Sequence, residues 1–362
     1  MSDRPEFIVE YLEPSAGIEA EPLPDEFSSS RLRHSLLILG AIVLVVIAVI
    51  VLVPGLSSLR SRFSGASVGW LLFAVVLQLA SCFSYVLVFR GVFCSKMSWL
   101  TSSEIGLSEL AANSVLSVGG AGGLALGAWI LRRGGLETAY IARRTVAFFL
   151  ITSFANTTFL VLGGLGLATH VLPGSPSWVL GAIPAAAALA VIGGALAAGR
   201  LTRRVSRLKV VAEGVEEALR LLRTGSFAIL FGAAGYMLFD VAMLGVCFVA
   251  FGNPLPPVGV LLVAYIIGQL GSLIPIPGGI GGVDGGLIGT LVIYGIDATD
   301  AAVAVIAYRG LLLAIPAILG LPALAVLRRR LRNEAHDIAA CAPGESVEVL
   351  GRGLVERPAP FI

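Results

Sequence analysis

The chain has 362 residues, of which 57% are hydrophobic and 13% are charged, and its mean hydropathy is +0.92. Soluble globular domains carry about 25% charged residues, so this composition excludes the ordinary soluble classes. The formal net charge of +2 carries little information, because acidic residues gather in the N-terminal tail and arginines at the ends of apolar segments. We therefore predict an all-α polytopic membrane protein.

The first 30 residues are polar and acidic, and we expect residues 1–30 to be a disordered tail without a cleavable signal. After this tail, the predicted spans, each long enough to cross a hydrocarbon core, are 36–53, 70–89, 145–168, 178–198, 227–251 and 301–327. The segment 200–223 is basic and amphipathic, and is interpreted either as a helix on anionic headgroups or as a solvated connecting helix. Residues 331–362 are predicted to be a disordered cytoplasmic tail.

Two apolar segments, 104–131 and 258–294, are interrupted by glycine-rich runs. The second contains Pro-Ile-Pro-Gly-Gly-Ile-Gly-Gly-Val-Asp-Gly-Gly at 275–286, and the first contains a weaker copy, Ser-Val-Gly-Gly-Ala-Gly-Gly, at 117–123. A bilayer tolerates irregular backbone only where it lines a cavity or is buried in protein, and transport sites are often built from such breaks. Each segment can form either a re-entrant hairpin or a pair of full crossings.

The placement of Lys and Arg between the spans predicts the orientation of the chain. The basic clusters expected inside are 132–144, 200–223 and 328–332, and the loops expected outside, without Lys or Arg, are 170–177 and 252–257. Arg60 and Arg62 in the external first loop are the exception. The halves 31–168 and 177–330 then each consist of span, span, broken hairpin and span, in opposite orientations. We predict two inverted-topology repeats with cytoplasmic N- and C-termini.

Ionisable side chains inside apolar spans are functional candidates, because burying them in lipid is costly. Asp240 lies near the middle of its span and is either functional or a structural partner of a neighbouring helix. Arg309 suits a phosphate, and its alternative is a salt bridge to Asp240 or Asp284. Asp284 either caps the helix that follows or contacts substrate. The N–H groups of the glycine turn that contains Gly278, Gly279 and Gly281 can hold an anion.

The first broken segment contributes further polar candidates. Glu109 and Asn113 lie one helical turn apart on a common face, and Glu109 is expected to face a cavity. Glu104 is expected at the membrane interface. Three amides, which we interpret as interhelical hydrogen-bonding residues, are Gln78, Asn156 and Gln269.

Motifs for metal, nucleotide and hydrolytic chemistry are missing from the sequence. The four cysteines form no CxxC pair and the three histidines stand singly, so we expect no metal site. The run at 279–284 has aspartate where a GxGxxG fingerprint needs its last glycine, and neither GxxxxGK[ST] nor HExxH occurs. We expect no cofactor, no catalytic residue and no nucleic-acid partner, and hence no enzyme.

The second glycine-rich run, together with Tyr294-Gly295 and Ala307-Tyr-Arg309, resembles the C-terminal signature of the lysylphosphatidylglycerol synthase transmembrane region. This region is the flippase-like domain of the multiple peptide resistance factors, and it also occurs alone. The resemblance covers nearly all of 31–330, the predicted flippase-like transmembrane domain. The family's turn, acid and arginine correspond to Pro277, Gly278, Gly279, Gly281, Asp284 and Arg309. The first-half copy lacks the usual proline, and Ala125 stands where the family carries an acid.

The resemblance implies a lipid translocase that moves a phospholipid or glycolipid across the cytoplasmic membrane, with membrane lipids as partners. Arg309 is expected to hold the phosphate, while Asp284 and Asp240 meet the headgroup or carry a coupling proton. The other binding candidates are Gly278, Gly279, Gly281, Glu109 and Asn113. In two-part relatives a soluble domain attaches lysine to phosphatidylglycerol. Because the sequence after Arg330 is short and polar, we expect no lysyl transfer.

Two other functions are compatible with the sequence. The chain could be a non-catalytic accessory or scaffold subunit that partners an envelope-biosynthesis enzyme through its tails and basic linker. It could also carry a small water-soluble anion. Lipid exchange by the purified protein would separate these functions from a translocase.

Overall fold

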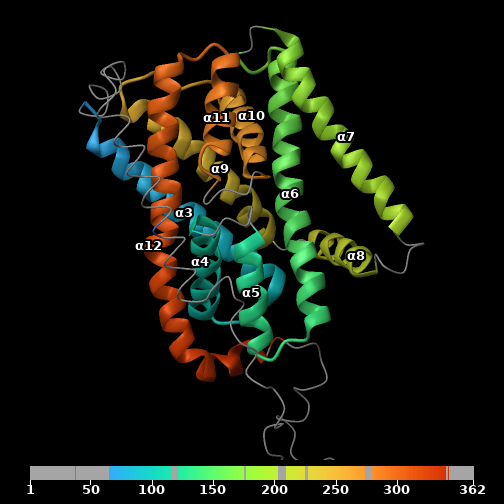
Figure 1. Cartoon of the computed structure of the whole chain (residues 1–362). Helices are drawn as coiled ribbons and strands as arrows, with labels where there is room; N and C mark the ends of the chain where they lie inside the picture. The colour runs from blue at the N-terminus through green and yellow to red at the C-terminus, as the bar shows by residue number, and fades with distance from the viewer. Residues whose placement is uncertain are drawn as a thin grey trace, which may run out of the picture.

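Helices make up all the regular structure in the computed structural model, which describes residues 37, 65–115, 121–174, 177–202, 209–224, 227–273, 279–339 and 341 (Figure 1). In chain order they are α3 (Val68–Phe93), α4 (Trp99–Val115), α5 (Ala121–Arg133), α6 (Thr138–Ala168), α7 (Trp178–Thr202), α8 (Lys209–Arg223), α9 (Phe227–Ala250), α10 (Val258–Gln269), the 3-10 helix η4 (Leu270–Leu273), α11 (Gly282–Ile293) and α12 (Ala298–Ala339). No strand occurs in these residues, so the predicted all-α class is confirmed. The predicted tail 1–30 and, apart from Leu37, the predicted span 36–53 lie outside the described residues.

Among the described residues, four helices are long and apolar enough to cross a membrane: α3, α6, α9 and the apolar part of α12, Ala298–Leu327. A helix rises about 1.5 Å per residue, so even the 24 residues of α9 exceed a hydrocarbon core of about 30 Å. Large apolar side chains such as Phe154, Phe231 and Ile318 are exposed on these helices. Exposed apolar surface on this scale is stable against lipid and not against water. The protein is therefore a multi-pass membrane protein.

The crossing of α3 and α9 forms the most extensive helix–helix contact in the described part of the chain. Gly232 on α9 permits the close approach, because a Cβ there would lie 2.6 Å from the Val88 side chain and 2.9 Å from the Ser84 carbonyl oxygen. Across the same interface, the Ser81 hydroxyl donates a hydrogen bond to the carbonyl of Tyr236 at 3.2 Å. Small residues and interhelical hydrogen bonds of this kind hold helices together within lipid.

The two glycine-broken segments form helical hairpins. α4 and α5 have 17 and 13 residues, and α10 and α11 have 12 each. At about 1.5 Å per residue each helix is shorter than a hydrocarbon core of about 30 Å. The two helices of each hairpin pack together, with α4 and α5 in the lower half of Figure 1 and α10 and α11 in the upper half. These helix lengths favour re-entrant hairpins, which approach the middle of the molecule from opposite ends (Figure 1), over the alternative of paired full crossings.

The helix contacts of the two halves correspond in pairs. α12 packs along α4, and α6 packs along α10, so the last span of each half covers the hairpin of the other half. An inverted-topology repeat would produce this exchange of partners. The repeat itself stays a prediction, since the span 36–53 that would complete the first half lies outside the described residues.

The last helix continues beyond the predicted end of the transmembrane domain. α12 reaches Ala339, so residues 331–339 of the predicted tail 331–362 are helical, and the rest of that tail, apart from Cys341, lies outside the described residues. Ile338 is fully buried, and a Cβ on Gly134 would lie 2.4 Å from its Cγ2. Cys341 forms a disulfide with Cys94, which follows α3. These tertiary contacts order a segment whose polar composition, considered alone, indicates a tail.

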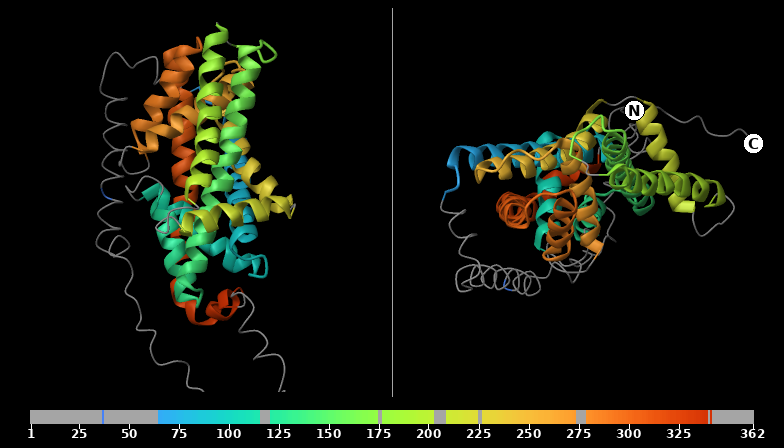
Figure 2. Two further views of the ribbon diagram at one scale, coloured as in Figure 1. Left: turned by 90° about the vertical axis from the view of Figure 1, so that its right-hand side faces the viewer. Right: turned by 90° about the horizontal axis from the view of Figure 1, so that it is seen from above.

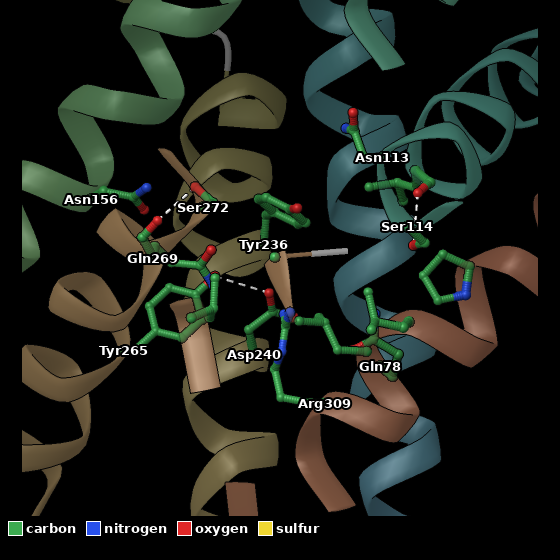
Figure 3. Close-up of a pocket in the computed structure, with 16 residues that line it drawn as sticks. Gln78, Asn113, Ser114, Asn156, Tyr236, Asp240, Tyr265, Gln269, Ser272 and Arg309 are labelled. Atoms are coloured by element: carbon green, nitrogen blue, oxygen red, sulfur yellow. Dashed lines mark hydrogen bonds between the residues drawn. The ribbon is translucent and has the colours of Figure 1, made fainter. Parts of the chain in front are cut away.

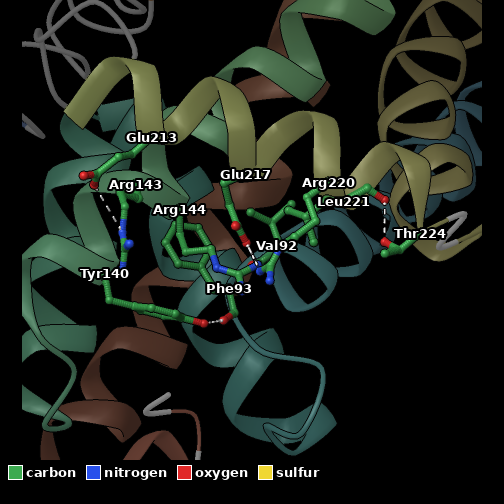
Figure 4. Close-up of polar contacts among 10 residues, drawn as sticks. All are labelled: Val92, Phe93, Tyr140, Arg143, Arg144, Glu213, Glu217, Arg220, Leu221 and Thr224. Atoms are coloured by element: carbon green, nitrogen blue, oxygen red, sulfur yellow. Dashed lines mark hydrogen bonds and ion pairs between the residues drawn. The ribbon is translucent and has the colours of Figure 1, made fainter. Parts of the chain in front are cut away.

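The basic linker forms the amphipathic helix α8, which lies across the long axis of the molecule (Figure 2). Two of its acidic side chains contact α6: Glu217 pairs with Arg144 at 3.0 Å, and Glu213 pairs with Arg143 at 3.7 Å (Figure 4). Both arginines lie within α6, which begins at Thr138. The basic loop predicted at 132–144 is therefore shorter than expected, because α5 ends at Arg133. The linker is docked on the protein by these ion pairs.

Candidate functional site

A polar cavity of about 270 Å³ lies where the end of α4 and the α10–α11 hairpin meet α9 and α12 (Figure 3). Its polar lining residues are Gln78, Asn113, Ser114, Asn156, Tyr236, Asp240, Tyr265, Gln269, Ser272 and Arg309. These residues come from seven different elements, so no single stretch of sequence encodes the cavity. Small-molecule sites usually measure about 300–1,000 Å³, and the cavity therefore suits a compact polar group.

Arg309 on α12 is the one cationic side chain among the described residues that line the cavity. Its Nε donates a hydrogen bond to Oδ1 of Asp284 at 2.9 Å, and its side chain is 8% exposed. A Cβ on Gly279 would lie 3.5 Å from Nη2 of Arg309, so the glycine turn passes beside the guanidinium. Gly279 has a φ of 65°, a conformation that glycine adopts without steric cost. The turn thus brings backbone groups next to the cation.

Asp284 both caps the helix that follows it and forms the salt bridge to Arg309, two of the interpretations that the sequence allowed. Its Oδ2 accepts a hydrogen bond from the backbone N–H of Gly281 at 2.7 Å, at the start of α11. Its Oδ1 accepts the hydrogen bond from Arg309. A carboxylate in the first turn also complements the positive end of the helix dipole. Asp284 does not itself line the cavity, but it orients the arginine that does.

Asp240 on α9 lines the cavity and is 2% exposed. Its Oδ2 accepts a hydrogen bond from the Tyr265 hydroxyl at 3.0 Å, whereas its Oδ1 has no hydrogen-bond partner among the described residues. Figure 3 shows Tyr265 and Arg309 on either side of the carboxylate. Of the two salt bridges predicted for Arg309, the one at 2.9 Å goes to Asp284. Asp240 instead joins α9 to α10 through its hydrogen bond with Tyr265.

Four of the polar residues that line the cavity carry side-chain amides. Gln78, Asn113, Asn156 and Gln269 extend into it from α3, α4, α6 and α10. The sequence identified three of these amides only as interhelical hydrogen-bonding residues, because an amide in an apolar span indicates polarity and not what it faces. Asn113 also has a structural contact, since its Oδ1 accepts a hydrogen bond from the backbone N–H of Gly123 at 2.7 Å. This contact ties α4 to α5.

Glu109 does not line the cavity, so the expectation that it faces the cavity is wrong. It is 1% exposed and accepts a hydrogen bond from the Tyr85 hydroxyl at 2.8 Å. Gly127 on α5 lies against the carboxylate, because a Cβ there would be 1.5 Å from Oε1. Glu109 shares a helical face with Asn113, yet neighbours from α3 and α5 enclose it. Helical spacing shows which residues share a face of a helix, but not which neighbouring helices cover each of them.

Apart from Asp284 and Glu109, the predicted binding residues divide into three groups by their position relative to the cavity. The predicted residues that line the cavity are Arg309, Asp240, Asn113 and Gly279. Gly281, with a φ of 86°, forms the turn that Asp284 caps. Gly278 lies outside the described residues. The cavity therefore offers one cation, one carboxylate and several groups that both donate and accept hydrogen bonds, which suits non-covalent recognition of a charged polar group.

Comparison with known protein families links most of this architecture to one family. A family model described as the lysylphosphatidylglycerol synthase TM region matches residues 38–320. The matched range contains both re-entrant hairpins and every residue that lines the cavity. No curated protein matches the chain.

Proposed function

Because the chain belongs to the lysylphosphatidylglycerol synthase transmembrane-region family, we propose that it is a lipid translocase that moves a phospholipid or glycolipid between membrane leaflets. The observation that carries this proposal is the polar cavity between two re-entrant hairpins, with Arg309 in its wall. Charged residues inside a membrane-embedded bundle are costly and usually serve a substrate or ion pathway. In this proposal the cavity is part of such a pathway, and its polar side chains line it.

In this mechanism Arg309 holds the lipid phosphate. A guanidinium is a permanently charged planar fork that matches the oxygen atoms of a phosphate. Asp284 holds the guanidinium by its Nε, beside the backbone of the glycine turn. A cavity of about 270 Å³ admits a headgroup, while the acyl chains stay in the surrounding lipid.

The two hairpins would control access to the cavity from opposite sides. The α4–α5 hairpin contributes Asn113 and Ser114, and the α10–α11 hairpin with η4 contributes Tyr265, Gln269 and Ser272. Alternating access in transporters with related architectures uses movement of one repeat against the other around a fixed site. We therefore assign each hairpin to one leaflet.

We also propose the cytoplasmic membrane as the location, with both termini in the cytoplasm. The supporting observation is that Arg132 and Arg133 lie in the last turn of α5 and that Arg143 and Arg144 lie in the first turns of α6, so four arginines flank the short α5–α6 connection. Cytoplasmic loops carry an excess of such residues. The sequence contains no GxxxxGK[ST] motif, so the proposed exchange is passive or coupled to an ion, with Asp240 as the candidate coupling group.

The direct test is leaflet exchange of labelled lipids in liposomes that contain the purified full chain. Arg309→Ala is expected to abolish exchange, whereas the matched control Arg223→Ala, on the exposed face of α8, is expected to retain it. Normal exchange by folded Arg309→Ala would overturn the assignment of the phosphate to Arg309. If the folded wild type exchanged no lipid, an accessory subunit would replace the translocase as the best-supported function.

A further inference from the structure

We propose that the cavity selects a hydroxyl-rich headgroup, such as a glycerol or a sugar joined to the lipid through its phosphate. The inference rests on the proposed translocase function and names the headgroup class that the same cavity would accept. Two observations carry it: two buried acceptors that lack donors, and a lining made mainly of amides and hydroxyls.

The two acceptors are Oδ1 of Asp240 and Oε1 of Gln78, and neither accepts a hydrogen bond of ordinary geometry from a described residue. The Ser81 hydroxyl lies near the Asp240 carboxylate, but it donates its proton to the carbonyl of Tyr236 at 3.2 Å. Both residues line the cavity, and each is 2% exposed. Buried polar atoms in native proteins are nearly always paired, and leaving one unpaired is unfavourable. A ligand with at least two donors would satisfy both atoms.

The serine hydroxyls add further acceptors to the wall. Ser114 donates its proton to the carbonyl of Leu110 at 3.0 Å, and Ser272 donates its proton to the carbonyl of Gln269 at 2.6 Å. A hydroxyl whose proton is used within its own helix offers only its lone pairs to a ligand. The cavity wall is therefore rich in acceptors, which favours a headgroup rich in donors.

The amide groups decide between hydroxyl and ammonium donors. Asn156 and Gln269 each present both an N–H donor pair and a carbonyl acceptor at the cavity. A hydroxyl donates and accepts, so it matches both halves of an amide, whereas an ammonium group only donates. A choline group offers no donor at all. A headgroup with several hydroxyls therefore satisfies more of the wall than an ethanolamine or a choline headgroup.

The experiment compares lipids that differ only in the headgroup. The full chain is reconstituted in liposomes with traces of phosphatidylinositol, phosphatidylglycerol, phosphatidylethanolamine or phosphatidylcholine. Each tracer carries the same fluorophore on an acyl chain, and an impermeant quencher reports its outer-leaflet fraction. We expect the two hydroxyl-bearing lipids to exchange at least about tenfold faster than the other two, because their hydroxyls can donate to the unpaired acceptors and also accept from the amide N–H groups, and an ammonium or choline group cannot do both.

The outcomes separate this inference from the function on which it rests. Equal exchange of all four lipids would overturn the headgroup class and leave the translocase standing, as would preference for phosphatidylethanolamine. No exchange of any lipid by folded protein would overturn both. Efflux of encapsulated glycerol phosphate without lipid exchange would show that the hydroxyl-rich phosphate is a free solute, which also overturns the lipid assignment.

Two cavity variants locate the selectivity. Asn156→Leu and Gln269→Leu each remove an amide and keep the side-chain size, and we expect each to reduce the preference for phosphatidylglycerol over phosphatidylcholine several-fold. Thr158→Val on α6 is the control, because the Thr158 hydroxyl bonds to the carbonyl of Phe154 in its own helix and does not line the cavity. Unchanged preference in both amide variants would contradict the assigned recognition.

Discussion

The guanidinium Nε of Arg309 lies 2.9 Å from Oδ1 of Asp284, and this ion pair joins the last span to the second re-entrant hairpin. Because Asp284 also accepts a hydrogen bond from the N–H of Gly281, one carboxylate sets both the start of α11 and the orientation of the guanidinium. The pair therefore couples the position of the hairpin to the residue that we propose as the phosphate ligand.

Removing this carboxylate should destabilise the protein more than the loss of a helix cap does. Asp284→Ala breaks an ion pair whose arginine is 8% exposed, and because Asp284 is 23% exposed we expect a cost of about 2–3 kcal/mol, at the low end for buried pairs. Asp297→Ala is the matched control: its Oδ1 accepts from the N–H groups of Thr299 and Asp300, and losing it should cost about 1 kcal/mol. Thermal unfolding in detergent measures both, and equal losses would show that the ion pair adds nothing.

Gly320→Ala should separate α12 from α4. A Cβ at Gly320 would lie 2.0 Å from the carbonyl oxygen of Leu107 and 2.6 Å from Cβ of Ala111, so the backbones must move apart. Overpacking of this kind costs about 1–3 kcal/mol. Gly310→Ala, in the same helix, meets nothing within 4 Å and should leave stability equal or slightly higher. The two variants are compared by unfolding temperature, and similar values for both would contradict the proposed close approach.

Each half of the molecule contains a tyrosine–acid pair. In the first half the tyrosine lies on the span and the acid on the hairpin, and in the second half the arrangement is reversed. Tyr85 on α3 donates to Glu109 on α4, and Tyr265 on α10 donates to Asp240 on α9. Replacing either tyrosine by Phe removes one buried hydrogen bond, which should cost about 1–3 kcal/mol of stability. Only the second pair lines the cavity, so we expect Tyr265→Phe to slow lipid exchange and Tyr85→Phe to leave it unchanged. Slowing by both variants would place Glu109 in the transport pathway.

The two ion pairs between α6 and α8 should differ in strength. The side chains of Arg144 and Glu217 are 15% and 17% exposed, and Arg144 also donates to the carbonyl of Val92 at 2.6 Å. We expect a double-mutant cycle on this pair to give about 1–2 kcal/mol, because both partners are largely buried and charge-assisted. The pair of Arg143 and Glu213 is 38% and 33% exposed, so screening should reduce its coupling to below about 1 kcal/mol. Cycles at low and high salt measure both couplings, and a larger value for the exposed pair would contradict this order.

Much of the fold was predictable because the relevant properties are local. Bilayer thickness sets how long an apolar run must be, and the predicted span 227–251 agrees with α9 to one residue. Glycine and proline disfavour continuous helix, so the glycine-rich runs at 117–123 and 275–286 by themselves indicate that both apolar segments are interrupted. The sequence left open whether each broken segment crosses the membrane, because that depends on how the short helices pack.

The candidate site was predictable only in part. Arg309 and Asp240 were identifiable from the sequence because a charge inside an apolar span is costly wherever the helix packs. The amides at positions 78, 156 and 269 carry the same kind of signal in a weaker form, and their meeting at one cavity depends on three helices that are distant in sequence. Helical spacing suggested that Glu109 joins them, yet Tyr85 and Gly127 enclose it elsewhere.

Membrane class, helical content, the positions of four spans and the glycine breaks thus follow from the order of residues alone, since each depends on apolar length, charge or backbone freedom within one segment. The partner of Arg309, the enclosure of Glu109, the ordering of α12 up to Ala339 and the composition of the cavity wall follow from packing between segments. Those contacts bring together groups from distant parts of the chain, and no local pattern specifies which of them meet.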